Sequence, residues 1–375
     1  MVTVGVHTHI TNPLSSGYLC YLACIESWAR VADEVVVVDG GSTDNSIPFL
    51  MDWLGPLARK VKVISTPETY WGAGEQWFWP QIAINRQVGF AALQTDWAIH
   101  VDADHVLSDT VTRKTLLTEL QSAASESVLS FWVSAFSGDQ LKYRVRSRQW
   151  IVNKRKHDIE YGIDEESRVH LDYPINAKSC AFFLDPVTGV RKSFLVGELI
   201  RSSGTLDIDT IRYGHFFFTV EQCIYKCRRI DLAISRYLGR APSKLRQITT
   251  DNKISLNKLT PLTKDQILSL GHPMPIKKLI DWCWQRDMLG GVMYSSYAAD
   301  RLFLRLFQLE RKLRTYLMRQ RGYRGGLDKL KFMTLNDSAD HNVLNICDLF
   351  VQQNAYLPKW ARLATTGLIS EHSAK

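Results

Sequence analysis

The sequence predicts an α/β protein whose amino-terminal part is a doubly wound, mostly parallel sheet. Over the first hundred residues, short apolar runs alternate with amphipathic stretches, which is the pattern of repeated strand–helix–strand units. Four consecutive valines, Val35 to Val38, cannot have a solvated face. They suit a central parallel strand with helices on both sides. With 375 residues, 45% of them hydrophobic, the chain can bury a sizeable core, which excludes disorder as its main state.

The expected elements follow one another in short steps. The apolar runs predict strands and the amphipathic stretches predict helices, in chain order strand Val2–Val6, helix Ser16–Val31, strand Glu34–Val38, helix Asn45–Leu54, strand Val61–Ile64, helix Glu75–Leu93 and strand Trp97–Val101. From about Val128 to Ser193 the pattern changes to strands with basic interruptions. Beyond Thr219 the pattern predicts mainly helix, apart from a proline-bearing loop region between Ala241 and Pro275. We therefore expect one α/β domain over residues 1–220 and a helical, basic region over residues 221–375.

The positive charge is concentrated toward the carboxyl end. The chain has 46 Lys and Arg against 38 Asp and Glu, a net charge of +8. Between Arg301 and Lys331, ten basic residues stand against only Glu310 and Asp328, so this stretch alone equals the net excess. Clustered positive charge attracts phosphates and anionic surfaces.

Cysteine usage and hydropathy exclude a disulfide scaffold and a membrane span. The seven cysteines lack zinc-site spacing, and two pairs, Cys20 with Cys24 and Cys223 with Cys227, are four apart on predicted helices, as buried small hydrophobes are. Apolar runs such as Val128–Phe136 are far shorter than the roughly 18 residues that span a bilayer. The start of the chain lacks the pattern of a signal peptide. We expect a cytoplasmic protein, with a peripheral position at the inner face of the cell membrane left open.

Two acidic segments directly follow predicted strands. Asp39 follows the four valines, and Asp102-Ala103-Asp104 follows the fourth strand. Ligands of a doubly wound sheet bind beyond the carboxyl ends of its strands, so both segments are expected at one crevice. Two carboxylates one residue apart suit Mg²⁺ or Mn²⁺, which prefer oxygen ligands and take more from phosphates. A carboxylate at Asp39 can accept hydrogen bonds from a ribose or a base.

Simpler interpretations of these acids stay open. A lone D-x-D such as Asp102 and Asp104 is often a turn or a helix cap. Ser42, Thr43 and Asp44 are well explained as a turn followed by a cap on the next helix. Only the order and position of the two segments favour a ligand site.

Three segments carry a family resemblance. They run from Asp33 to Asp44, from Asn85 to Gly89 and from Thr95 to Asp104. They resemble the nucleotide-sugar-binding domain of family 2 glycosyltransferases, which have the GT-A fold, and the spacing from Gly89 to Asp102 matches as well. The resemblance implies a Rossmann-like, mixed and mostly parallel sheet, a nucleoside-diphosphate-sugar donor with UDP-sugar favoured, and Mn²⁺ or Mg²⁺ as cofactor.

The resemblance also implies roles for single residues. Asp39 would lie near the base or ribose, Arg86 near the diphosphate, and Asp102 at the ribose. The implied donor-binding set is Thr8, Asp39, Arg86, Asp102 and Ala103, and the implied metal ligands are Asp104 and His215. Two positions depart from the family pattern. His105 stands where many members have a third acid, and Gln87 stands where an asparagine is common.

An inverting transfer also needs a general base on the acceptor side. Asp164 and Glu165 lie in a segment, Tyr161–Glu166, that weakly resembles the catalytic loop of lipopolysaccharide-core-type bacterial members. Asp207 and Asp209 are a second candidate pair. Each of these is also explained as a solvated loop acid.

Three further features have more than one interpretation. His215 precedes an aromatic run and is either a core histidine or a contact to the diphosphate and metal. The aromatic segment Trp71–Trp79 is either core packing or a lining for the sugar. The amphipathic, basic helix Arg301–Arg321 and the glycine-rich turn Gly322–Leu327 resemble the tail of the lipopolysaccharide-type subgroup. That helix docks on the catalytic domain, lies on an anionic membrane surface, or does both with different faces.

These observations favour an inverting, metal-dependent glycosyltransferase that adds a sugar to a hydroxyl of a glycan or lipid-linked acceptor. One alternative is transfer to a modified base in DNA, with the basic segments 142–156 and 301–331 tracking phosphates. Nucleic acid is the less favoured partner because no nucleic-acid motif accompanies the charge. Another alternative is a non-catalytic member that binds a nucleotide sugar without turnover.

Overall fold

The protein is described from a computed structural model. It describes residues 2–15, 17–66, 79–123, 128–137, 140–147, 149–156, 160–164, 169–184, 191–199, 202–213 and 263–286. Within these residues the strands are β1 Val4–Ile10, β2 Glu34–Asp39, β3 Val61–Ser65, β4 Trp97–His100, β5 His105–Leu107, β6 Val128–Ser137, β7 Gln140–Arg146, β8 Ile151–Asn153, β9 Glu160–Asp164, β10 Val169–Leu184, β11 Arg191–Leu199 and β12 Gly204–Arg212. The helices are α1 Cys20–Val31, α2 Ser46–Leu54, the 3-10 helix η1 Gly55–Lys60, α3 Trp79–Ala92, α4 Arg113–Ser122, α7 Lys264–Leu268 and α8 Met274–Gln285.

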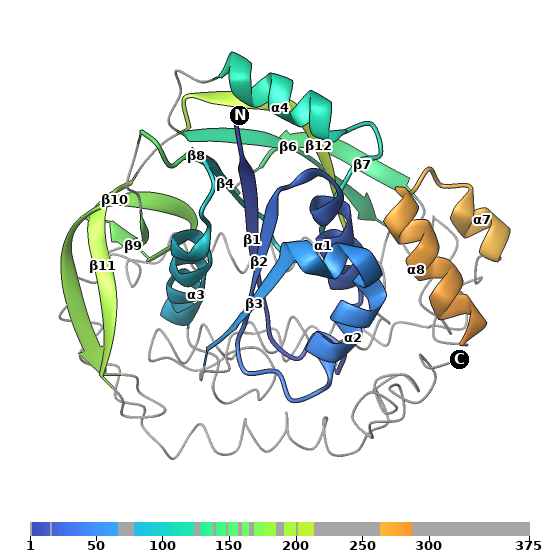
Figure 1. Cartoon of the computed structure of the whole chain (residues 1–375), viewed down its shortest axis with the longest axis horizontal. Helices are drawn as coiled ribbons and strands as arrows, with labels where there is room; N and C mark the ends of the chain where they lie inside the picture. Colours follow the sequence, from blue (N-terminus) through green and yellow to red (C-terminus); the bar gives the residue numbers. More distant parts are fainter. Residues whose placement is uncertain are drawn as a thin grey trace, which may run out of the picture.

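Within the described residues, the main sheet has nine strands in the order β3-β2-β1-β4-β8-β6-β12-β5, with β7 paired to β6 (Figure 1). Strands β1 to β4 are parallel to one another. Antiparallel β8 joins this half to β6 and β12, which are themselves parallel. Strands β9, β10 and β11 form a second, small sheet. The predicted α/β class with a mixed sheet and flanking helices is confirmed.

Alternation along the central strands explains how helices cover both faces. In β2, Val35 and Val37 join the large core cluster that includes α1, whereas Val36 and Val38 are equally buried but point to the other face. That second face lies against α3, because α3 contacts β1 and β2. The four valines therefore make a strand without a solvated side, as their sequence predicts.

Helix α8, the last helix in the described part of the chain, belongs to the same core as α1. Its buried residues Ile276, Leu279 and Ile280 join the core cluster. At the rim, the Lys278 ammonium pairs with Glu26 of α1 at 3.1 Å. The described part of the region beyond residue 220 therefore packs on the amino-terminal half, while the predicted boundary itself lies outside the described residues.

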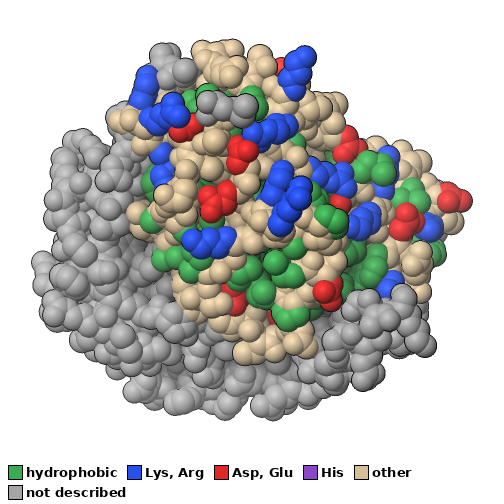
Figure 2. Space-filling view, viewed as in Figure 1, with side chains coloured by type: hydrophobic (Ala, Val, Ile, Leu, Met, Phe, Trp, Pro, Cys, Tyr) green, Lys and Arg blue, Asp and Glu red, His purple; other side chains and the backbone are tan. Residues whose placement is uncertain are grey.

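On the face shown in Figure 2, the described lysine and arginine side chains are interspersed with acidic ones. Several basic residues of the segment 142–156 have partners in the protein. Arg155 pairs with Asp96 at 2.5 Å, and the Lys154 ammonium donates to the carbonyls of Phe90 and Leu93 at the end of α3, at 2.9 and 2.6 Å. Lys154 and Arg155 therefore stabilise the fold through contacts within the protein.

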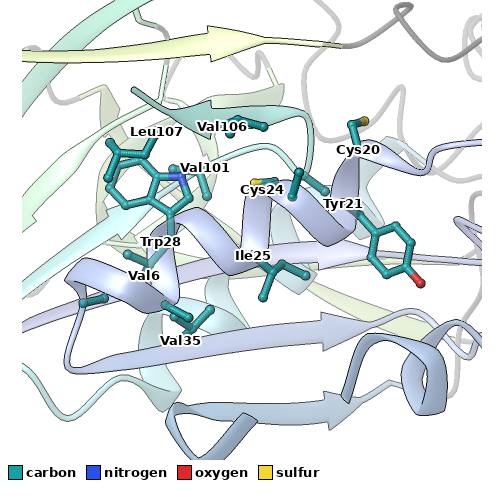
Figure 3. Close-up of a cluster of buried hydrophobic side chains, with 14 of the residues drawn as sticks. Val6, Cys20, Tyr21, Cys24, Ile25, Trp28, Val35, Val101, Val106 and Leu107 are labelled. Carbon is teal, nitrogen blue, oxygen red and sulfur yellow. The ribbon is translucent and has the colours of Figure 1, made fainter. Parts of the chain in front are cut away.

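Helix α1 is buried along most of its length. Cys24, Ile25 and Trp28 pack on the strands beneath, next to Val6 and Val35 (Figure 3). The side chains of Cys20 and Cys24 are buried and neither is part of a disulfide bond, as the spacing predicts.

Two element boundaries differ from the sequence prediction. Strand β1 runs from Val4 to Ile10 rather than from Val2 to Val6, because a strand between two parallel neighbours can bury polar residues that a hydropathy pattern rejects. Helix α1 begins at Cys20 rather than Ser16. The chain before it turns through left-handed conformations at Asn12 and Gly17, which a helix does not accommodate.

The carboxyl-terminal expectations are tested only in part. A short helix, α7, lies within the predicted loop region, and its Thr263 cap with Gln266 explains the departure. Among the described helices, none has both the length and the apolar composition that crossing a bilayer requires. The basic helix predicted at Arg301–Arg321 lies outside the described residues.

Candidate functional site

The two acidic segments lie at the same edge of the sheet. Strand β1 runs between β2 and β4, all three are parallel, and the register pairs Ile10 with Asp39 and His7 with His100. The carboxyl ends of β2 and β4 therefore point the same way. The chain passes directly from β4 into the loop that carries Asp102 and Asp104.

Asp39 is buried, with 4% of its surface exposed. Its carboxylate accepts a hydrogen bond from the backbone N–H of Ser42 at 3.0 Å and another from the Ser65 hydroxyl at 3.4 Å. Gly41 takes a left-handed backbone conformation, with φ of 78°, which the turn between Asp39 and Ser42 requires. The carboxylate thus fixes the loop after β2, and its contact with a base or ribose stays a prediction.

Asp44 acts at the start of helix α2, as expected. One carboxylate oxygen accepts from the backbone N–H and the hydroxyl of Ser46, and the other accepts from the N–H of Ser15 at 2.7 Å. Asp44 is therefore a structural residue that joins the helix to the loop after β1.

The loop after β4 gathers three groups that suit a metal ion. Asp102, Asp104 and His105 each offer a ligand atom, and these atoms lie within 4.8 Å of one another. Two carboxylates and an imidazole are a donor set that Mn²⁺ and Mg²⁺ accept, with oxygen preferred. Asp104 was predicted as a ligand, Asp102 was assigned to the donor, and His105 was noted only as a departure from the family pattern. The sequence prediction gives His105 no role as a metal ligand.

Asp102 is the most accessible member of this cluster. Its side chain is 28% exposed. The guanidinium of Arg86 donates to its Oδ1 at 3.0 Å, and the side-chain amide of Gln149 donates to its Oδ2 at 2.7 Å. Arg86 is itself buried, so its described contact orients Asp102. Contact of Arg86 with a diphosphate stays a prediction.

Asp104 is almost completely buried, with 1% exposed. Arg212, at the end of β12, donates from Nε to its Oδ2 at 3.2 Å. Its Oδ1 lies 3.5 Å from Nε2 of His105. Burial, and then the charge of Asp104, raise the pKa of the Tyr18 phenol well above its usual value. Asp104 is thus a buried anion with a nearby cation.

Side chains of helix α1 form hydrogen bonds with the backbone of the acidic loop. The indole of Trp28 donates to the carbonyl of His105 at 3.0 Å, and the Cys24 thiol approaches the same carbonyl at 3.2 Å. The hydroxyl of Ser27 accepts the backbone N–H of Leu107 at 3.0 Å. These contacts fix the backbone on which Asp104 and His105 stand.

A group of histidines lies on the α3 side of β1 and β4. The rings of His7 and His100 have centroids 5.0 Å apart, and the ring of His9 is stacked at 6.4 Å from that of His100. Burial, and then the charge of Arg86, hold the pKa values of His7 and His100 well below normal. These two rings are therefore neutral at pH 7, and they add no charge behind Asp102.

Helix α3 approaches β1 closely at a glycine. A Cβ on Gly89 would lie 2.8 Å from Nδ1 and 3.0 Å from Cβ of His7. Gly89 follows Arg86 by three residues and thus lies near the same face of the helix. Close approach at Gly89 brings Arg86 toward β4 and Asp102.

The remaining predicted residues have less support from geometry. Thr8 is buried within β1, and Ala103 is buried between the two acids. Asp164 ends β9, but its side chain, like Glu165 and His215, lies outside the described residues. The aromatic segment after β3 is likewise outside them up to residue 78.

The alternative acid pair lies on the surface. Asp207 and Asp209 both accept hydrogen bonds from the guanidinium of Arg144, at 2.5 and 2.7 Å. Their side chains are 75% and 39% exposed, and the guanidinium also lies over the ring of Trp132. This is the geometry of a surface ion pair.

Comparison with known proteins gives one family. Residues 21–183, which include Asp39, Arg86 and the Asp102–His105 loop, match the family model described as glycosyl transferase family 2. Together with the mixed sheet and its flanking helices, this match is consistent with the GT-A fold. No curated protein matches the chain.

Several solved structures resemble the chain at low identity. TarS 1–349 from S. aureus, solved with UDP-GlcNAc, is 12% identical over 94% of this chain and 92% of that chain, with a TM-score of 0.34. The mannosyltransferase PcManGT from Pyrobaculum calidifontis, solved with GDP-Man and Mn²⁺, is 13% identical over 97% and 86%, with a TM-score of 0.31. Glucosyl-3-phosphoglycerate synthase from Mycobacterium tuberculosis, solved with Mn²⁺ and UDP-Glc, is 16% identical over 35% and 44%, with a TM-score of 0.23.

Proposed function

We propose that the protein is an inverting, metal-dependent glycosyltransferase that moves a sugar from a nucleoside-diphosphate-sugar to a hydroxyl of a glycan or lipid-linked acceptor. The observation that carries the proposal is the cluster of Asp102, Asp104 and His105 at the carboxyl edge of the sheet, in a segment that matches the glycosyltransferase family 2 model. A UDP-sugar is the favoured donor, as the sequence resemblance implies.

In this proposal the cluster holds Mn²⁺ or Mg²⁺ together with the donor diphosphate. When bound, the cation supplies charge stabilisation to the departing diphosphate. The chain supplies the orientation, since Arg86 and Gln149 fix both oxygens of Asp102 and α1 fixes the loop. Asp39 binds the base or ribose from the neighbouring strand end.

The transfer itself needs a carboxylate that takes a proton. The acceptor oxygen attacks the anomeric carbon from the face opposite the diphosphate, the bond to the diphosphate oxygen breaks, and the acceptor proton passes to the base. We assign the base to Asp164 or Glu165 on the basis of their sequence context. His215 remains the proposed additional contact to the metal or diphosphate.

Donor binding is tested first, by thermal shift with UDP-, GDP- and dTDP-sugars, each with and without Mn²⁺. We expect a UDP-sugar with Mn²⁺ to raise the melting temperature, because a ligand that binds only the folded state stabilises it by mass action. If none of these donors shifts the melting temperature, the proposal fails.

Turnover is tested by donor hydrolysis and transfer with Mn²⁺ in the wild type and in Asp104→Asn. Activity should fall by about 100-fold or more if Asp104 holds the cation at the transferring diphosphate. Asp209→Asn is the matched control, because it also removes one carboxylate paired with an arginine, but on the surface. Donor binding without turnover would favour a non-catalytic nucleotide-sugar-binding protein.

A further inference from the structure

The charges around the acidic loop are balanced by arginines. Asp102 pairs with Arg86 at 3.0 Å, and Asp104 pairs with Arg212 at 3.2 Å. Each carboxylate is thus paired with a guanidinium of opposite charge. A cation that binds here therefore meets carboxylates that each already have a positively charged partner.

Burial makes this balance effective. Asp104 is 1% exposed and its partner Arg212 is 28% exposed, so water and salt screen this pair less than they screen a fully exposed one. A divalent cation placed beside Asp104 would be attracted by the carboxylate and repelled by the Arg212 guanidinium on the same group. The repulsion should weaken binding of the cation alone.

A nucleoside diphosphate adds negative charge at the acidic loop. Its phosphates carry two or more negative charges near neutral pH, which would offset the added charge of the cation. Each ligand then supplies the charge that the other lacks, so each should raise the affinity for the other by the same factor.

We infer that Arg212 makes the binding of the divalent cation depend on the nucleoside diphosphate. Arg212 neutralises Asp104, so the cation binds weakly by itself and tightly together with the diphosphate. Arg212 is a positioning residue in this inference, since it acts through Asp104. The inference rests on the proposed function, because it takes the acidic loop as the cation and diphosphate site.

The experiment measures Mn²⁺ binding by the full chain from the electron paramagnetic resonance signal of free Mn²⁺, with and without saturating UDP or GDP. Binding of Mn²⁺ to the nucleotide in solution is measured separately and subtracted. For the wild type we expect the nucleotide to raise the Mn²⁺ affinity by about 5- to 150-fold, the usual range of coupling between sites.

Three variants identify the residue responsible. Arg212→Gln should bind Mn²⁺ alone about tenfold more tightly than the wild type and should lose most of the coupling. Arg212→Lys keeps the charge and should keep the coupling. Arg144→Gln removes an arginine from a surface acid pair and should leave both affinities unchanged.

Each contrary outcome has a definite meaning. If Arg212→Gln binds UDP but binds Mn²⁺ alone no more tightly than the wild type, the inference is wrong and the proposed function stands. If the wild type binds neither UDP nor GDP with Mn²⁺ present, the proposed function is wrong and the inference falls with it. If Arg212→Gln does not fold, the wild-type measurement still decides, because equal Mn²⁺ affinity with and without nucleotide overturns the inference.

Discussion

Replacement of Gly89 by alanine would test whether close approach of α3 to β1 maintains the site. The added Cβ would lie 2.8 Å from Nδ1, 3.0 Å from Cβ and 3.2 Å from Cγ of His7, whereas carbon contacts are optimal at about 3.5–4.0 Å. The helix must therefore move away by roughly 0.5–1 Å. His7 cannot move aside freely, because it is buried beside the ring of His100.

Two effects oppose each other in the stability of Gly89→Ala. Overpacking a buried contact costs about 1–3 kcal/mol, while alanine in place of glycine within a helix gains about 0.8–1.0 kcal/mol. We expect the free energy of unfolding to fall by about 0–2 kcal/mol, the difference between these two effects. Urea denaturation followed by circular dichroism measures it.

The same displacement should reach the acidic loop. A shift of α3 carries Arg86 away from Asp102, whose contact is 3.0 Å. We expect the affinity for UDP with Mn²⁺, measured by calorimetry, to fall more than the stability loss alone would explain. The double variant His7→Ala, Gly89→Ala is the control, because removal of the ring leaves room for the Cβ. A variant Gly89→Ala that is more stable than the wild type by the full helix gain, or a double variant with purely additive effects, would refute the reasoning.

Two further predictions concern the support of the site and its pH dependence. Trp28→Phe keeps a buried aromatic ring but removes the N–H donor to the His105 carbonyl. The free energy of unfolding, measured by urea denaturation, should fall by about 1–3 kcal/mol. A change of less than about 0.5 kcal/mol would mean that this hydrogen bond contributes little. Burial, and then the charge of Lys277, lower the pKa of His272 to about 4. Between pH 6.5 and 4 the unfolded chain therefore takes up a proton at this residue that the folded protein does not. The contribution of His272 to the free energy of unfolding is full above pH 6.5 and declines as the pH falls through this window. His272→Asn should reduce that slope by up to about 1.4 kcal/mol per pH unit; an unchanged slope in urea denaturation at several pH values would assign the dependence to other groups, such as His7 and His100, whose pKa values are also lowered.

Local patterns predicted the sheet and its acidic edge well. The run Val35–Val38 and the acids that follow β2 and β4 are signals within a few residues, and a parallel register turns them into neighbouring strand ends. The same local logic failed at β1, where His7 and His9 interrupt the hydropathy pattern. Their burial depends on β4 and α3, which no window around β1 contains.

The partners of the acids depend on contacts far apart in the chain. Arg212 lies 108 residues from Asp104, and Gln149 lies 47 residues from Asp102. Neither residue stands in a sequence pattern of its own. Strand order decides the first pair, since Arg212 of β12 lies opposite His105 of β5 in the sheet. A reader of the sequence could have suspected a buried counter-charge for Asp104, but could not have chosen it among 46 lysines and arginines.

The support of the acidic loop by α1 has a consequence for how this protein can change over evolutionary time. Cys24, Ser27 and Trp28 look like ordinary interior residues, yet each contacts the backbone next to the acids. Substitutions at these three positions would be selected against both because they impair folding and because they impair activity. A selection for activity alone should therefore deplete substitutions in this helix almost as strongly as substitutions of the acids themselves, whereas one for folding alone should tolerate changes of Asp102, whose side chain is partly exposed.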